Sequence, residues 1–181
     1  MEEEMLKQLE DLKKRVGKLE KNRKDQLSTA IVSGDLDKIL ATMIISLAAA
    51  ASDTKVKLFF SFWALSALRS PKKKAQGKDF ISKMFGLMLP KGRNKLKLSK
   101  MNMMGMGPAM IKFLMRKQNV MLLDEMFKQA AELGIEIIVC EMSMNLMGFK
   151  KEEIIDYPHL NYAGAATFVA EASQSSIQFF I

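Results

Sequence analysis

Cysteine and histidine are nearly absent from this chain of 181 residues, which contains one of each, Cys140 and His159. A single cysteine cannot form an internal disulfide and provides none of the paired spacings of a zinc site. One histidine argues against a histidine-based metal site or catalytic triad. We therefore expect a reducing, cytoplasmic location with no bound metal or cofactor.

Long hydrophobic runs are also missing. The most apolar stretch covers residues 39–51, which is 13 residues, whereas a membrane-spanning helix needs about 20. The N-terminus is charged from its second residue, unlike a signal peptide. We expect residues 39–51 to form a buried core helix and the chain not to be embedded in a membrane.

Acidic residues are scarce in one segment. The net charge is +8, and residues 69–100 contain eleven Lys or Arg against one acid, Asp79. Such a basic segment implies an anionic partner, which is an acidic protein face, a small oxyanion or nucleic acid. Phe80 and Phe85 are the only aromatics there, which argues against the stacking surface of a single-strand binder.

Residues 1–25 form a separate element with apolar residues at alternating spacings of four and three. These residues are Met5, Leu9, Leu12, Val16 and Leu19. The stripe resembles the a and d positions of a coiled coil but is short for one. It predicts an amphipathic helix, either docked on its own domain or binding a partner or a second copy. A domain follows over residues 26–181, with the basic segment 69–100 inserted.

The hydrophobic pattern predicts an alternation of strands and helices. Strands are expected over residues 27–32, 56–62, 134–140 and 177–181. Helices are expected over residues 36–51, 63–68, 80–89, 109–116, 121–133, 141–148, 150–156 and 164–173. This order favours a parallel sheet covered by helices, with Asp35 as an N-cap and with ligands at the carboxyl edge of the sheet.

Cys140 lies where a strand is expected to end and a helix to begin. Unpaired N–H groups and the positive end of the helix dipole favour the reactive thiolate there. The alternative is that a lone cysteine is a small buried hydrophobe. The chain also contains sixteen methionines, with clusters at 101–106 and 142–147. One interpretation is that they fill gaps in the packing, with the first cluster folding over a pocket. The alternative is that they contact a soft metal such as Cu(I).

Several strings then point to one family. They are SGDLDK at 33–38, FFSFW at 59–63, LSKMNMMGMGP at 98–108, VCEMSMNLMG at 139–148, GAATF at 164–168 and QFFI at 178–181. Together they resemble the DsrE/DsrF-like sulfurtransferase family, in its DsrE-related, "peroxiredoxin-like" branch. The resemblance covers residues 27–181 and leaves out the first 25.

The resemblance implies a three-layer α/β fold with a mostly parallel five-stranded sheet flanked by helices. It implies homo-oligomers, as trimers or hexamers, and a carrier cysteine that holds sulfane sulfur as a persulfide, or a thiosulfonate group. Only Cys140 matches that cysteine. Relatives pass sulfur to TusA-like carriers or work beside heterodisulfide-reductase-like systems, and small sulfur anions are further expected partners.

We therefore expect a sulfurtransferase or thiosulfonate transferase with Cys140 as its reacting residue. The residues expected to bind the transferred group are Ser33, Gly34, Lys100, Asn102, Met142 and Ser143. Trp63 either walls the pocket or is a buried structural residue, and Glu141 is expected to point away from the thiol. The rival hypothesis is a non-catalytic oligomeric scaffold that docks an acidic partner. The hypothesis of peroxidase activity has little support, because the chain has no resolving cysteine.

Overall fold

The computed structural model describes residues 2–22, 24–73 and 80–181. Its centre is a sheet of five strands in the order β4-β3-β2-β1-β5, and every pairing is parallel. The strands are β1 (Lys24–Ile31), β2 (Lys55–Phe60), β3 (Glu136–Cys140), β4 (Leu160–Ala163) and β5 (Ser175–Phe180). The predicted three-layer α/β fold is confirmed.

Helices cover both faces of this sheet. The α-helices of the described ranges are α1 (Glu2–Asn22), α2 (Leu36–Ala51), α3 (Leu65–Leu68), α4 (Phe80–Met88), α5 (Met106–Lys117), α6 (Leu123–Glu132), α7 (Glu141–Leu146) and α8 (Ala165–Ala172). Short 3-10 turns occur at Phe62–Ala64, Arg93–Lys95, Met103–Gly105 and Lys151–Glu153. No helix in the described part of the chain is both long and apolar enough to cross a membrane.

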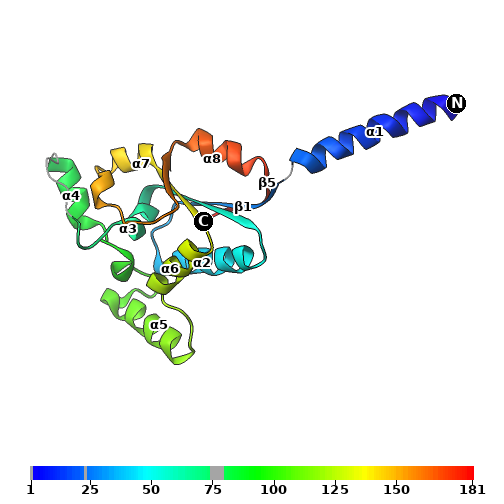
Figure 1. The fold of residues 1–181 in the computed structure, drawn as a ribbon. Helices are drawn as coiled ribbons and strands as arrows, with labels where there is room; N and C mark the ends of the chain where they lie inside the picture. Colours follow the sequence, from blue (N-terminus) through cyan, green and yellow to red (C-terminus); the bar gives the residue numbers. More distant parts are fainter. Residues whose placement is uncertain (1, 23, 74–79) are drawn as a thin grey trace.

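The two faces of the sheet differ in their packing. Figure 1 shows α2 and α6 on one face, α7 and α8 on the other, and α5 beyond the α2 and α6 layer. The main core lies between the sheet and α2 with α6, and its fully enclosed members include Leu27, Ile31, Leu58, Phe60 and Ile39. The predicted helix over 39–51 is part of α2, which supplies one wall of this core with a single buried face, whereas Ile44 and Ile45 on its other face are exposed.

The face below α8 is more polar. Gln26 donates hydrogen bonds to Ser28 and Ser175, and all three side chains are buried between β1, β5 and α8. Among the described residues, the buried apolar cluster on this side consists of Phe59, Ile138 and Cys140. Because apolar burial is small here, α8 is held to the sheet more by polar contacts than by a hydrophobic core.

The structure differs from the predictions at four local points. Strand β4 was not expected, and residues 150–156 form only the 3-10 turn Lys151–Glu153 instead of a helix. Asp35 occupies the N-cap position of α2 but makes no capping bond with its side chain, which accepts a hydrogen bond from Ser33. The helix starting at 63 is also split into a 3-10 turn and α3.

The basic segment is partly neutralised inside the chain. Arg69 is buried, lies 3.7 Å from Glu153, and donates to the carbonyl oxygens of Gly86, Leu89 and Pro90. Lys73 pairs with Asp156, and Arg93 pairs with Asp124. These pairs reduce the charge that the segment offers to a partner. Lys74 and Lys78 lie outside the described residues.

We expect Arg69→Ala to lower the free energy of unfolding by about 3 kcal/mol, because removing one partner of a buried pair leaves the other charge uncompensated. The carbonyl oxygens of Gly86, in the last turn of α4, and of Leu89, just after it, lose their donor at the same time. Urea unfolding measures the change. The control is Lys95→Ala, which removes an exposed cation of the same segment. Equal stability of the two variants contradicts the structural role of Arg69.

Candidate functional site

The candidate site is built where β2 and β3 end side by side. Cys140 is the last residue of β3 and the N-cap of α7, so the strand passes into the helix with no loop between them. The register pairs Phe60 with Val139, which places Ser61, the next residue after β2, beside Cys140. The expectation that the thiol lies between a strand end and a helix start is confirmed.

Two hydroxyl groups are linked to the thiol. Ser143 Oγ donates a hydrogen bond to Cys140 Sγ at 3.3 Å, and the hydroxyl oxygens of Ser61 and Ser143 are 2.8 Å apart. Since the Ser143 proton is directed at sulfur, Ser61 is the donor in the second bond. All three residues are buried. The Ser61 hydroxyl thus holds the Ser143 hydroxyl in position. A thiolate at Cys140 would find this hydrogen-bond donor already directed at it.

Ser61 was not among the predicted site residues. Its hydroxyl reaches α7 only because β2 and β3 are adjacent and in register. The sequence shows only that Ser61 directly follows a predicted strand, and this position identifies it once the adjacency of β2 and β3 is known.

Helix α8 closes the site. Cys140 packs with Phe59 and Ile138, and Ala163 and Phe168 cover this cluster. The rings of Phe59 and Phe168 stack with centroids 5.0 Å apart. Cys140 is 1% exposed as a result. A second sulfur atom can reach this buried thiol only after part of this cover has moved, and Phe168 of α8 belongs to that cover.

An ion-paired lysine holds α8 in position. Lys57 Nζ lies 3.0 Å from Glu171 on α8 and 3.2 Å from Glu136 on β3. Burial lowers the pKa of Lys57, but its hydrogen bonds to the two carboxylates outweigh burial and leave the pKa raised. The stabilisation by a charged Lys57 is therefore complete below its ordinary pKa and is lost only as pH rises through the raised value.

Other predicted residues surround a cavity at the same edge of the sheet. Ser33 and Gly34 line a space of about 270 Å³ with Trp63, Ser66 and Lys97 among its other walls. Trp63 is 50% exposed, so its interpretation as a buried structural residue is wrong. A Cβ on Gly34 would collide with the backbone of Trp63, which shows how closely the two strand ends approach.

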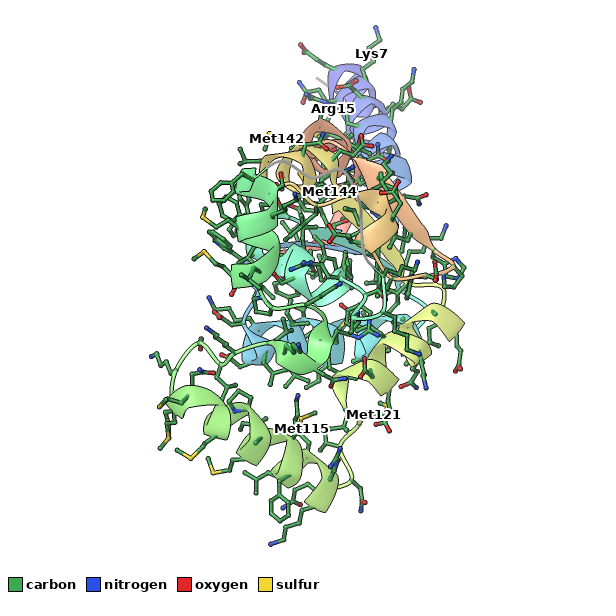
Figure 2. All side chains as sticks on the ribbon, turned by 90° about the vertical axis from the view of Figure 1, so that its left-hand side faces the viewer. Lys7, Arg15, Met115, Met121, Met142 and Met144 are labelled. Atoms are coloured by element: carbon green, nitrogen blue, oxygen red, sulfur yellow. The ribbon has the colours of Figure 1, made fainter. Side chains whose placement is uncertain are left out.

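Met142 and Glu141 lie at the start of α7. Met142 is exposed, and Glu141 pairs with Lys151 at 3.0 Å. The Glu141 carboxylate thus points away from the thiol, as expected. Figure 2 shows Met142 and Met144 on this helix, at the opposite end of the molecule from Met115 of α5.

The structure does not bring Lys100 and Asn102 to Cys140. Asn102 accepts a hydrogen bond from the backbone of Leu98, and its segment leads into α5, on the far side of the sheet from α7. The methionine-rich segment does line a cavity, of about 670 Å³, which Asn102 and Met104 share with Lys112. That cavity belongs to the α5 side of the molecule.

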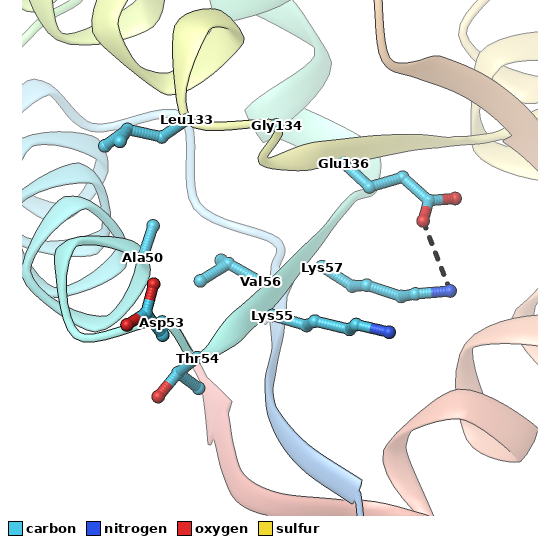
Figure 3. Close-up of a pocket in the computed structure, with 9 residues that line it drawn as sticks. All are labelled: Ala50, Asp53, Thr54, Lys55, Val56, Lys57, Leu133, Gly134 and Glu136. Atoms are coloured by element: carbon cyan, nitrogen blue, oxygen red, sulfur yellow. Dashed lines mark ion pairs between the residues drawn. The ribbon is translucent and has the colours of Figure 1, made fainter.

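A further cavity lies at the amino ends of β2 and β3. Figure 3 shows its lining residues, among them Lys55, Thr54 and the ion pair of Lys57 with Glu136, around about 350 Å³. It contains no thiol and lies at the opposite edge of the sheet from Cys140. Within the described ranges, no cluster of three or more His, Cys, Asp or Glu residues is arranged to hold a metal ion.

Comparison with known proteins agrees with this architecture. The model of the DsrE/DsrF/DrsH-like family matches residues 23–180. The chain belongs to this family. An uncharacterized protein YrkE of Bacillus subtilis is 43% identical over 151 residues, covering 83% of this chain and 93% of the relative. The sulfur carrier protein DsrE2 of Allochromatium vinosum is 32% identical over 163 residues, covering 87% and 99%. The resemblance seen in the sequence is confirmed.

We expect Phe168→Ala to raise the rate at which iodoacetamide alkylates Cys140 by about tenfold. Loss of the stacked ring should lower the free energy of opening the site by about 1–2 kcal/mol. Mass spectrometry at pH 8, where Lys57 is charged, gives the rate.

The matched control is Val169→Ala, which shortens a neighbouring side chain of α8 that is 63% exposed. Its alkylation rate should equal that of the wild type. If Phe168→Ala reacts no faster than Val169→Ala, α8 is not the cover of the thiol.

Proposed function

We propose that this protein is a cytoplasmic sulfur-relay protein that carries sulfur on Cys140 and passes it to a partner thiol. The single observation that carries the proposal is the hydrogen bond from the held Ser143 hydroxyl to the lone thiol. Family membership supports it, as does the printed name of one relative, a sulfur carrier protein.

In the persulfide form of the proposal, the Cys140 thiolate attacks the outer sulfur of a donor persulfide. A new S–S bond forms at Cys140, the S–S bond of the donor breaks, and the donor leaves as a thiolate. An acceptor thiolate then attacks the outer sulfur on Cys140 and restores the Cys140 thiolate. Each step exchanges one S–S bond for another, so no external oxidant or reductant is needed.

A thiosulfonate can be carried by the same exchange. The Cys140 thiolate attacks an inner sulfur of tetrathionate, the central S–S bond breaks, and thiosulfate leaves. Cys140 then carries an S–SO₃ group bonded to Sγ. An acceptor thiolate can attack the sulfur atom bonded to Sγ, which transfers the S–SO₃ group to the acceptor and releases the Cys140 thiolate. In both forms the Ser143 hydroxyl stabilises the thiolate that begins and ends the cycle.

The chain carries surfaces that suit partners. Ile177, Phe179 and Phe180 leave apolar side chains exposed on β5, an edge strand of the sheet. An exposed apolar edge strand favours pairing with another chain, which supports a homo-oligomer such as a trimer or hexamer. Lys97 is exposed and lines the cavity of Ser33 and Trp63 at the carboxyl edge of the sheet, where an acidic TusA-like carrier or a heterodisulfide-reductase-like subunit can dock.

One observation favours a second function. Cys140 is as enclosed as an ordinary core residue, which is what a non-catalytic scaffold with an idle cysteine would show. The two functions differ in whether the thiol ever takes up sulfur.

We expect intact mass spectra of the wild type to gain one sulfur atom after a persulfide donor, or one S₂O₃ group after tetrathionate. Cys140→Ser should gain neither, because the chain has no other cysteine. Equal adducts on both proteins would exclude sulfur relay through Cys140. An unmodified wild type whose Cys140 is alkylated by iodoacetamide under the same conditions would favour the scaffold.

We expect Ser143→Ala to take up sulfur about tenfold more slowly, since a hydrogen bond to a charged group is worth about 1.5–3 kcal/mol and part of it is regained from water. Asn145→Ala, at an exposed position of α7, is the control and should react at the wild-type rate. Circular dichroism verifies that both variants are folded. A wild-type rate in Ser143→Ala would remove the hydroxyl from the mechanism.

A further inference from the structure

The apolar stripe of α1 from Met5 to Val16 is exposed and has no partner among the described residues. Figure 1 shows α1 projecting from the body of the protein, with β1 following almost directly. Met5, Leu9, Leu12 and Val16 are between 49% and 61% exposed. The alternative of a helix docked on its own domain therefore does not hold, and the stripe is free to meet another molecule.

An isolated helix of this kind is marginally stable in water. It has 21 residues, includes Gly17, and gains almost nothing from its own ion pairs, since Arg15 and Asp11 lie 3.8 Å apart in full solvent. Burial of its apolar stripe is the remaining source of stability. A partner helix with the same spacing provides that burial along the whole length.

The identities of the seam residues select the partner. Spacings of four and three put Leu9 and Val16 at a positions and Met5 and Leu12 at d positions. Val16 at a with Leu12 at d is the combination that favours two parallel strands, whereas Leu9 and Met5 fill the seam without adding to that preference. Leu6 follows at an e position, is also exposed, and widens the apolar seam.

Charge complementarity points the same way. Arg15 falls at a g position, and from the sequence Glu20 falls at the e position five residues later. In a parallel, in-register pair, the g residue of one helix lies beside this e residue of the other, so each pair brings Arg15 next to a glutamate. We infer that α1 forms a parallel two-stranded coiled coil with α1 of a second copy of this chain.

This pairing is separate from the sulfur chemistry and from contacts of the α/β body. The family match begins at residue 23, beyond the end of α1. A coiled coil of barely three heptads is weak alone. Contacts between the α/β domains of two copies would raise the effective concentration of one α1 helix for the other. They would thereby strengthen the coiled coil.

The direct test is a disulfide between helices in the full-length chain. Met5→Cys is made in the Cys140→Ser background, so that residue 5 carries the only thiol. After mild oxidation with diamide, a non-reducing gel should show mostly cross-linked dimer. The control is Lys7→Cys in the same background, at an f position outside the seam, which should stay mostly monomeric on the gel (Figure 2 labels Lys7).

Absence of a Met5→Cys cross-link, or equal cross-linking of the Lys7→Cys control, overturns the proposal. An antiparallel pair also fails this test, because residue 5 would lie on the order of 20 Å from its counterpart. Such a separation is too long for a disulfide.

A charge exchange provides a second, independent readout. Arg15→Glu should shift the mass found by analytical ultracentrifugation toward the smaller assembly, with the dissociation constant raised about tenfold by two unfavourable pairs. Arg15→Glu combined with Glu20→Arg should restore the wild-type mass. A double variant that stays as dissociated as the single one would exclude parallel, in-register pairing.

Discussion

The enclosure of Cys140 beneath α8 is the constraint on which the rest of the site depends. Phe168 stacks on Phe59 and packs against the buried cluster that contains the thiol, while Lys57 ties α8 to β3 through two carboxylates. Polar contacts dominate the remainder of this interface, whereas the opposite face of the sheet holds the main hydrophobic core. Local opening of α8 therefore costs less free energy than global unfolding, and it can expose the thiol while the sheet stays intact.

In the relay we propose, the same enclosure would determine which sulfur atom an acceptor can attack. A sulfur carried on Cys140 would extend beyond Sγ, the atom that the Ser143 hydroxyl contacts in the buried cluster. Attack at the outer atom transfers sulfur, whereas attack at Sγ would release sulfide and leave a mixed disulfide. Shielding of Sγ favours transfer, and the Ser61 hydroxyl contributes by keeping the Ser143 donor directed at the leaving thiolate.

Local features of this fold were predictable, and long-range ones were not. The boundaries of α2, the position of Cys140 between strand and helix, and Ser143 one turn later all follow from periodicity within a short segment. Strand β4 was missed because its four residues are stabilised by pairing with β3 instead of by a clear hydrophobic pattern. Ser61 and Phe168 reach the thiol across the sheet, and Arg69 is buried by a partner more than eighty residues away, so neither spacing nor composition reveals them.

The most direct test of the account follows sulfur after it has been loaded. Protein carrying one sulfur atom on Cys140 is separated from the donor and mixed with an acceptor that has a single thiol, and intact masses of both are recorded over time. The account predicts that the sulfur leaves Cys140 and appears on the acceptor in equal amount, with the Cys140 thiol restored. Sulfur that stays on Cys140, or release of sulfide with no modified acceptor, would contradict it.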